Sequence, residues 1–290
     1  MSPLRSGAPP RRLLRFAALP VLAVLLLSGC SEKLDLKEVD RSVVRVQHVF
    51  QFKGKNIPGA HGTGFVLNSD GYIITNRHVV DVQNNLPDGV KALHLFVPDG
   101  SWDKRLPAKV VWSSEKYDLA VLHVPGLIRP PVVLANVKPL VSPEKGERVY
   151  AIGFPGAGDV TGSQAALEST ITQGAVSKVT LGRGSQNGAE RMIIQHSADI
   201  NLGNSGGPLF NDCGQVIAVN TFAATSTFRI VRKPGGQTIA KGSAVSGVYY
   251  SPHVASLIEI LTTEPALRNV RFQSSPAVCV PESGTPIGMY

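Results

Sequence analysis

Short apolar runs that end in glycine, proline or asparagine recur along this chain, and few stretches before residue 250 keep a helical period. Apolar and β-branched runs separated by turn residues are typical of strands joined by tight turns. We therefore expect an all-β fold and one short helix at 254–261. The expected strands begin at Val43 and then cover 64–67, 72–75, 93–97, 108–112, 119–124, 148–153, 165–171, 174–179, 191–195, 207–210, 215–221 and 247–250.

Prolines crowd the segment 125–143, which is typical of a connector between two halves. The two runs of short strands beside it predict two barrels or sandwiches. We expect an N-terminal β domain at 42–135 and a C-terminal one at 136–261. Residues 262–290 hold four prolines and little periodicity, so they are expected to form an extended tail.

The first residues have the pattern of an export signal. Four arginines and no acidic residue precede the apolar run 16–27, which is short for a membrane span. The run ends in Leu27-Ser28-Gly29-Cys30, which resembles the lipobox of bacterial lipoproteins. We expect a signal peptide at 1–29, a lipid anchor on Cys30 that favours the outer membrane, and a polar tether at 30–41. An ordinary secretory signal or an uncleaved anchor are the alternatives.

Cleavage before Cys30 would remove four positive charges and lower the formal net charge from +8 to +4. The remaining chain has no basic run with interleaved aromatic residues, so we expect no nucleic-acid partner. No spacing of histidine, cysteine and acidic residues indicates a zinc site, and we expect no metal and no cofactor. Cys213 and Cys279 can pair in an oxidising compartment or stay unpaired, and the sequence leaves both open.

The segment 203–210, Gly-Asn-Ser-Gly-Gly-Pro-Leu-Phe, places Ser205 among glycines. Such a loop can turn sharply and lets a substrate approach the hydroxyl, although a plain glycine turn between strands has the same composition. Serine needs a general base and an orienting acid to act as a nucleophile. The sequence offers His78 in Thr75-Asn76-Arg77-His78-Val79-Val80 and Asp118 in Tyr117-Asp118-Leu119-Ala120-Val121.

These motifs, together with Gly62-Thr63-Gly64-Phe65, resemble those of chymotrypsin-like serine peptidases, and in particular the protease domain of the HtrA/Deg family. They follow the family's order, histidine, aspartate, serine, within roughly residues 40 to 255. The resemblance implies two six-stranded antiparallel β-barrels with the active site in the cleft between them. It also implies that His78 and Asp118 lie in the first barrel and Ser205 in the second.

By this resemblance Ser205 attacks a peptide carbonyl, His78 moves the proton, and Asp118 orients the imidazole. Backbone N–H groups of the segment Gly203, Asn204 and Ser205 would form the oxyanion hole, and a side chain at 203 should crowd it. We expect a serine endopeptidase of the bacterial cell envelope that cleaves exported or misfolded proteins. The motifs do not decide whether it assembles as a homo-oligomer.

The sequence gives less direct evidence of substrate preference. Asp199 lies where trypsin-like relatives carry the aspartate of the S1 pocket, which would favour arginine or lysine at P1. HtrA relatives generally have a small apolar residue there and cleave after small aliphatic residues, so Asp199 departs from that family. The segment Asn220, Thr221 and Phe222 would form a wall of the pocket, which Phe222 could narrow. Alternatively, Asp199 is a hydrogen-bonded loop residue turned away from the pocket.

Two further features concern regulation, and only the first departs from the HtrA pattern. HtrA proteins usually carry PDZ domains after the protease, and the residues after the expected helix are too few for one, so we expect no PDZ domain here. Asn204 stands where zymogen-type relatives carry an aspartate that pairs with a new N-terminus. Asparagine there resembles the HtrA pattern and predicts activity without such a cut.

Two other functions compete. Gly-Asn-Ser-Gly-Gly also fits the nucleophile elbow of α/β-hydrolases, with Asp212 and His253 downstream, but that elbow must lead into a helix and the residues after Gly207 indicate a strand. The other alternative is a catalytically silent trypsin-like lipoprotein that serves as a binding module, because a complete triad does not guarantee an open oxyanion hole.

Overall fold

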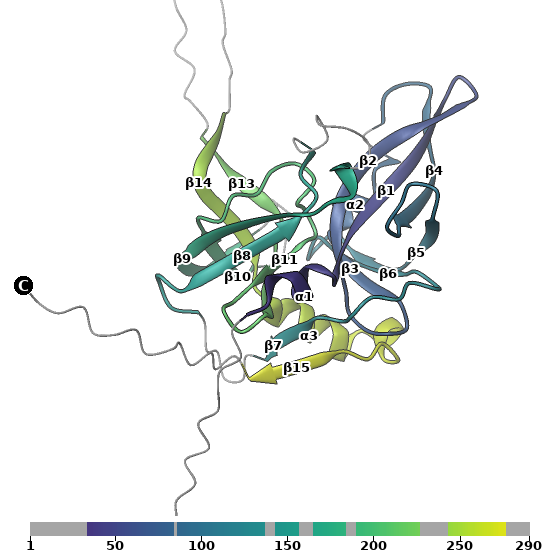
Figure 1. Ribbon diagram of the computed structural model, residues 1–290. Helices are drawn as coiled ribbons and strands as arrows, with labels where there is room; N and C mark the ends of the chain where they lie inside the picture. Colours follow the sequence, from purple (N-terminus) through teal and green to yellow (C-terminus); the bar gives the residue numbers. More distant parts are fainter. Residues whose placement is uncertain are drawn as a thin grey trace, which may run out of the picture. The chain divides into compact units, whose positions relative to one another are not determined.

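The computed structural model describes residues 34–83, 86–136, 143–156, 165–183, 190–226 and 243–276 (Figure 1). The expected signal peptide, Cys30, the first residues of the tether and Cys279 lie outside these ranges. Within them, no helix combines the length and the hydropathy needed to cross a bilayer.

The first half of the chain closes into a six-stranded antiparallel barrel of order β1-β2-β3-β6-β5-β4. Its alternating apolar residues point inward, so Val46, Ile73 and Leu122 are fully buried. This confirms the first expected barrel. Its strands are β1 (Val43–Phe52), β2 (Lys55–Val66), β3 (Tyr72–Thr75), β4 (Val90–Pro98), β5 (Arg105–Ser114) and β6 (Leu119–His123).

The second half forms a nine-stranded sheet of order β13-β14-β10-β9-β8-β11-β12-β7-β15, and this sheet is not closed. The expectation of a second closed six-stranded barrel is therefore wrong for the described residues. The strands are β7 (Val133–Asn136), β8 (Arg148–Gly153), β9 (Thr170–Arg183), β10 (Glu190–His196), β11 (Pro208–Phe210), β12 (Gln215–Val219), β13 (Phe222–Ser226), β14 (Ser243–Pro252) and β15 (Gln273–Pro276).

Besides β13, which directly follows the expected strand 215–221, two of these strands come from segments in which the sequence predicted none. β7 lies in the proline-rich connector, where Val133–Asn136 is free of proline and buries Leu134 and Ala135 completely. β15 lies in the expected tail and pairs in parallel with β7. The side chain of Gln215 also holds β15, because its Nε2 donates to the carbonyl of Pro276 over 2.9 Å. Both strands extend the sheet beyond the β12 edge.

The remaining elements are short. A helix α1 (Leu36–Asp40) replaces part of the expected tether, because Asp35 caps it by accepting a hydrogen bond from the N–H of Lys37 and its apolar residues pack on the core. A 3₁₀ turn η3 (Ala165–Leu167) and a break precede β9, where one strand was expected from 165. The helices α2 (Arg77–Val80), α3 (Val254–Thr263) and η4 (Pro265–Leu267) complete the fold, and α3 matches the predicted helix.

One apolar core connects the two sheets. Phe65 and Ile74 of the barrel belong to the same buried cluster as Ile152 and Leu209 of the second sheet. The helix α3 buries Leu257 and its neighbours in this cluster and contacts β7 and β12. A second buried cluster, which includes Val46, Ile73 and Leu122, fills the barrel itself, so the shared core packs the second sheet against a barrel that also has an interior of its own.

Cys213, in the turn between β11 and β12, is disulfide-bonded. The chain has two other cysteines, Cys30 and Cys279, and both lie outside the described residues. The tail comes close to this turn, since the carbonyl of Pro276 accepts a hydrogen bond from Gln215.

Two histidines are buried in the second half. His196 Nε2 lies 2.9 Å from the hydroxyl of Ser251, and His253 Nδ1 accepts the N–H of Ala255 at the start of α3. Burial lowers the pKa of His196 and of His253 to about 4, because the interior disfavours the charged imidazolium. Both residues are therefore neutral in the folded protein at neutral pH.

These two histidines predict acid sensitivity. Their pKa is near 6.5 in the unfolded chain and lower in the folded one, so stability is complete above pH of about 6.5 and falls as the pH decreases toward 4. Each buried histidine should remove roughly 3 kcal/mol across that window. Urea unfolding at a series of pH values measures the loss. His253→Asn, which keeps a cap acceptor but cannot gain a proton, should reduce the slope, whereas the exposed His94→Asn should not. Equal slopes in all three proteins would contradict the assignment.

Candidate active site

The three predicted catalytic residues lie at ends of elements. His78 is in the short helix α2, which directly follows β3 of the barrel. Asp118 directly precedes β6, which pairs with β3, so the two side chains start from adjacent strands. Ser205 lies in the glycine loop before β11 of the second sheet. Strand pairing in the barrel therefore brings the histidine and the aspartate together.

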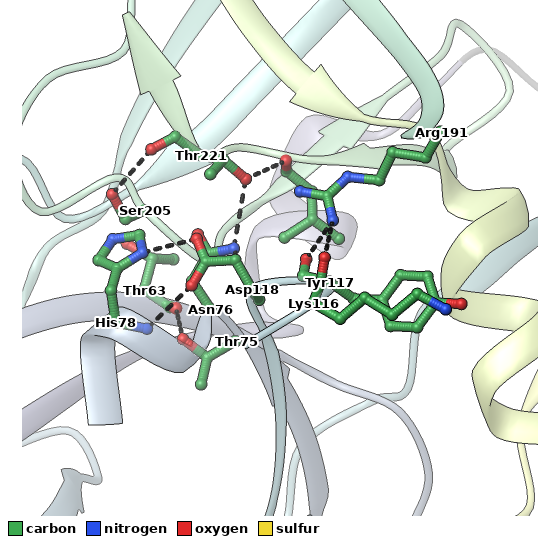
Figure 2. A network of polar contacts seen from close by, with 11 residues as sticks. Thr63, Thr75, Asn76, His78, Lys116, Tyr117, Asp118, Arg191, Ser205 and Thr221 are labelled. Carbon is green, nitrogen blue, oxygen red and sulfur yellow. Dashed lines mark hydrogen bonds and ion pairs between the residues drawn. The ribbon is translucent and has the colours of Figure 1, made fainter. Parts of the chain in front are cut away.

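The carboxylate of Asp118 holds His78 at two points (Figure 2). Its Oδ2 lies 2.8 Å from His78 Nδ1, and its Oδ1 accepts the backbone N–H of His78 over 3.0 Å. The His78 side chain is 49% exposed and that of Asp118 is 26% exposed. This arrangement selects the tautomer with the proton on Nδ1 and leaves Nε2 without a hydrogen bond to any described residue.

The backbone of Asp118 is in an uncommon conformation, with φ of 51° in the left-handed region. Its carbonyl accepts two hydrogen bonds, from Asn76 Nδ2 over 2.8 Å and from the N–H of Arg77 over 3.1 Å. A non-glycine residue at positive φ costs of the order of 1 kcal/mol or more and persists only where its surroundings fix it. The donors on the β3–α2 turn supply part of that constraint.

The hydroxyl of Ser205 donates to the carbonyl of Thr221 over 3.3 Å and makes no hydrogen bond to His78 (Figure 2). Asn76 links the two parts of the site, because its Nδ2 also lies 3.2 Å from the hydroxyl of Thr221. The structure thus assembles the histidine and aspartate pair, with the serine hydroxyl directed to another acceptor.

Thr63 of β2 holds the glycine loop against the barrel. Its hydroxyl donates to the carbonyl of Gly203 over 2.6 Å and accepts the N–H of Phe154 over 3.0 Å. Its own N–H donates to the carbonyl of Ser205 over 2.9 Å. These contacts fix the loop on both sides of residue 204.

The backbone N–H groups of Gly203 and Ser205 have no acceptor among the described residues. The N–H of Asn204, in contrast, donates to the carbonyl of Asn201 over 3.0 Å. Asn204, which the sequence placed in the oxyanion hole, therefore has no free N–H to offer. Its side chain is buried and its Oδ1 has no partner in the described structure.

The sequence of this region decides the family. A family model for the trypsin-like peptidase domain matches residues 62–219, which is more than half of the chain and includes all three motifs. The chain belongs to the trypsin-like peptidase domain family.

Proteins similar to this trypsin-like domain carry names of the HtrA and DegP type. The chain is 36% identical over 160 residues to a probable periplasmic serine endoprotease, DegP-like, of Pseudomonas savastanoi, covering 55% of this chain and 28% of that protein. It is 33% identical over 231 residues to serine protease HTRA3 of Homo sapiens, covering 76% and 47%. The chain thus spans less than half the length of these relatives.

The fold also matches solved structures. The serine endoprotease from Yersinia pestis superimposes with a TM-score of 0.54 at 24% identity, over 81% of this chain and 66% of that one. At this identity the match supports the fold alone. The chain thus combines the sequence motifs of the trypsin-like domain with a fold that matches a solved serine endoprotease.

The predicted S1 residues of this trypsin-like domain differ in exposure. Asp199 is exposed, and its Oδ1 accepts the hydroxyl of Tyr249 over 2.6 Å. Asn220 is fully buried, and its amide bonds the carbonyl of Pro208 and the hydroxyl of Ser251. Its side chain therefore faces the interior and supports the strand. Phe222 begins β13, and its side chain lies outside the described part of the structure.

Sequence reasoning missed two residues of the site. Thr63 lies in a motif that carried the resemblance, but a threonine in a strand gives no signal of its double role toward Gly203 and Phe154. Asn76 had a clearer signal, because it is a polar residue at the end of a buried strand, two positions before the predicted catalytic histidine His78. It is fully buried and joins Asp118 to Thr221.

The esterase alternative does not assemble. Ser205 is followed by the strand β11, and no helix follows it as the nucleophile elbow requires. His253 caps α3 and Asp212 accepts the hydroxyl of Tyr150, so neither reaches Ser205. In the described ranges, no three histidine, cysteine or acidic side chains gather as a metal site would require.

Gly203 is required for a reason that differs from the predicted one. Its φ is +101°, and a Cβ there would lie 2.3 Å from the carbonyl oxygen of Phe154 and 2.7 Å from His61 Nε2. The collision is with the wall behind the loop. An added side chain would thus displace the backbone that presents the N–H group.

We predict that Gly203→Ala lowers kcat by on the order of 100-fold, because a displaced oxyanion donor loses about 3 kcal/mol of transition-state stabilisation. Peptide hydrolysis by the purified variant measures this loss. Gly126→Ala is the matched control, since Gly126 also has positive φ (+81°) but no atom within 4 Å of an added Cβ. A Gly203→Ala variant with wild-type kcat would contradict the prediction.

Proposed function

We propose that this chain is a serine endopeptidase that hydrolyses peptide bonds through Ser205, His78 and Asp118 and an acyl-enzyme. The observation that carries the proposal is the double contact between Asp118 and His78, which directs Nε2 away from the carboxylate. A neutral imidazole in this tautomer can accept a proton at Nε2, and the carboxylate stabilises the cation that forms.

Ser205 must change its side-chain rotamer to enter the reaction. Its hydroxyl now bonds the carbonyl of Thr221, and the long contact of 3.3 Å is weak. Rotation about one bond would redirect the hydroxyl to His78, which would take its proton as the oxygen attacks the carbonyl carbon. The imidazolium would then protonate the leaving amine, and water would release the acyl group in a second round.

The free N–H groups of Gly203 and Ser205 support an oxyanion hole of two donors. Neither is used within the described structure, and buried or half-buried N–H groups are rarely left without an acceptor. A carbonyl oxygen that becomes negative in the transition state would satisfy both. The contacts of Thr63 to the carbonyls of the same loop hold these groups in place.

We further propose that the protein acts in the bacterial envelope, anchored by lipid at Cys30, on exported or misfolded polypeptides. The export pattern of residues 1–29 supports this location, and DegP-like relatives are named periplasmic endoproteases. The catalytically silent binding module is the second candidate. The observation that favours it is the missing hydrogen bond between Ser205 and His78.

A fluorophosphonate probe separates these two functions. The wild-type protein should be labelled at Ser205, because the probe reacts only with a serine that a neighbouring base has activated. Ser205→Ala should not be labelled, and His78→Ala should lose nearly all labelling. In-gel fluorescence reads the result. Failure of folded wild-type protein to react would favour the binding module.

We propose a basic P1 preference from Asp199. Its carboxylate is exposed, its described side-chain partner is the neutral Tyr249, and it forms no ion pair with a described lysine or arginine. Its negative charge is thus available to a lysine or arginine of the substrate.

A peptide library should therefore be cut preferentially after arginine and lysine. Asp199→Asn should reduce kcat/KM for such peptides by about 10- to 100-fold, since one charge-assisted contact is lost, and should spare peptides with valine or alanine at P1. Asp103→Asn removes an exposed carboxylate elsewhere and serves as control. Cleavage after valine or alanine alone in the wild-type protein would mean that Asp199 is a loop residue without a role in binding.

A further inference from the structure

A buried arginine of the second sheet reaches the loop that carries Asp118. Arg191 lies on β10 and is 5% exposed. Its Nη1 donates to the carbonyl of Tyr117 over 2.7 Å and approaches the carbonyl of Lys116 at 3.3 Å (Figure 2). These are the two residues directly before Asp118. The guanidinium thus spans from the sheet that leads to Ser205 to the barrel that carries Asp118.

The burial of this cation is not explained by packing. Within the described residues Arg191 forms no ion pair, and its Nε has no hydrogen-bond partner. Burial lowers the pKa of Arg191, and the nearby charge of Asp118 acts in the opposite direction. A buried charge with incomplete partners is unfavourable compared with an apolar residue of similar length. An arginine at this position therefore costs stability that an unbranched apolar side chain would not.

Three successive carbonyls before β6 are held by donors. Arg191 donates hydrogen bonds to the carbonyls of Lys116 and Tyr117. The side chain of Asn76 and the N–H of Arg77 donate to the carbonyl of Asp118. Asp118 needs this support, because its positive φ is unfavourable for a residue with a side chain. Of these donors, only Arg191 comes from the second sheet.

We infer that Arg191 is a positioning residue for the catalytic acid. It fixes the backbone at 116 and 117, and this keeps Asp118 at positive φ with both carboxylate oxygens on His78. Its hydrogen-bond partners in the described structure are the carbonyls of Lys116 and Tyr117, not Ser205 or His78. The catalytic consequence rests on the proposed function, whereas the effect on the bond between Asp118 and His78 does not.

The backbone geometry of Asp118 then depends on how the second sheet packs against the barrel. His78 and Asp118 belong to the barrel, and strand pairing alone would place them near each other. Arg191 on β10 holds the backbone directly before Asp118. The sheet that contains β10 also contains β11, the strand that follows Ser205. The aspartate therefore reaches its working geometry only when the second sheet is in place.

Three variants test the inference. Arg191→Met keeps an unbranched side chain without donors, and Arg191→Lys keeps the charge on a side chain that ends one bond short of Nη1, the atom that bonds both carbonyls. Arg41→Met is the control, because Arg41 is exposed and pairs only with Glu38 on α1 in the described structure. Thermal melts select the variants that fold.

The first measurement is the far-downfield proton resonance of the hydrogen bond between His78 and Asp118, assigned by its loss in Asp118→Ala. We expect it in the wild-type and Arg41→Met proteins, weakened in Arg191→Lys and absent in Arg191→Met. The second is hydrolysis of a peptide substrate. Arg191→Met should lower kcat by about 10- to 100-fold with KM nearly unchanged, and Arg191→Lys should recover part of it.

A folded Arg191→Met protein with the wild-type resonance and wild-type kcat would overturn the inference, and so would a loss of stability alone. If Arg191→Met does not fold, an unchanged resonance and kcat in Arg191→Lys would overturn it as well. The resonance does not require turnover. A wild-type protein that shows it but neither hydrolyses peptide nor reacts with the probe would contradict the proposed function and leave the role of Arg191 to be decided by the resonance.

Discussion

The site depends on the two hydrogen bonds that the hydroxyl of Thr63 makes. This hydroxyl donates to Gly203 of the nucleophile loop and accepts from Phe154 after β8, so one barrel side chain joins two segments of the second half. The backbone of the same residue bonds Ser205, and the hydroxyl of Thr75 bonds the carbonyl of Thr63. Because Thr63, Thr75 and Phe154 are buried, breaking one of these hydrogen bonds would leave a buried polar atom without a partner, at a cost of about 1–3 kcal/mol.

Asp118 is also held by hydrogen bonds from buried side chains. Asp118 is placed near His78 by the pairing of β3 with β6, but its strained backbone is held by side chains that are themselves buried. Asn76 supplies one donor from the barrel, and Arg191 supplies another from β10. Both side chains keep polar atoms without partners, which are Asn76 Oδ1 and Arg191 Nε. Such incomplete satisfaction is tolerated where it fixes a geometry that function needs.

The apolar pattern predicted the two β-rich halves and the helix at 254–261, whereas the six-stranded barrel and the pairing of His78 with Asp118 followed from the resemblance of the ordered motifs to a known family. The sequence missed β7 and β15, since parallel pairing of Val133–Asn136 with Gln273–Pro276 joins segments far apart in the chain that are rich in proline. It also assigned Asn220 to a pocket wall, although its amide bonds Ser251 in the interior. The direction of a side chain at a strand end depends on tertiary partners, which no residue pattern contains.

The resting position of Ser205 follows from this network. Asn76 bonds both the carbonyl of Asp118 and the hydroxyl of Thr221, and the carbonyl of Thr221 accepts the proton of Ser205. Asn76 therefore links Asp118 to Thr221, the residue whose carbonyl accepts the serine proton. Since the hydrogen bond of the Ser205 hydroxyl is long, leaving it costs little, and a substrate carbonyl at the N–H groups of Gly203 and Ser205 would place the attacked carbon beside that hydroxyl. In the proposed mechanism, the Ser205 hydroxyl would leave the carbonyl of Thr221 and turn toward His78.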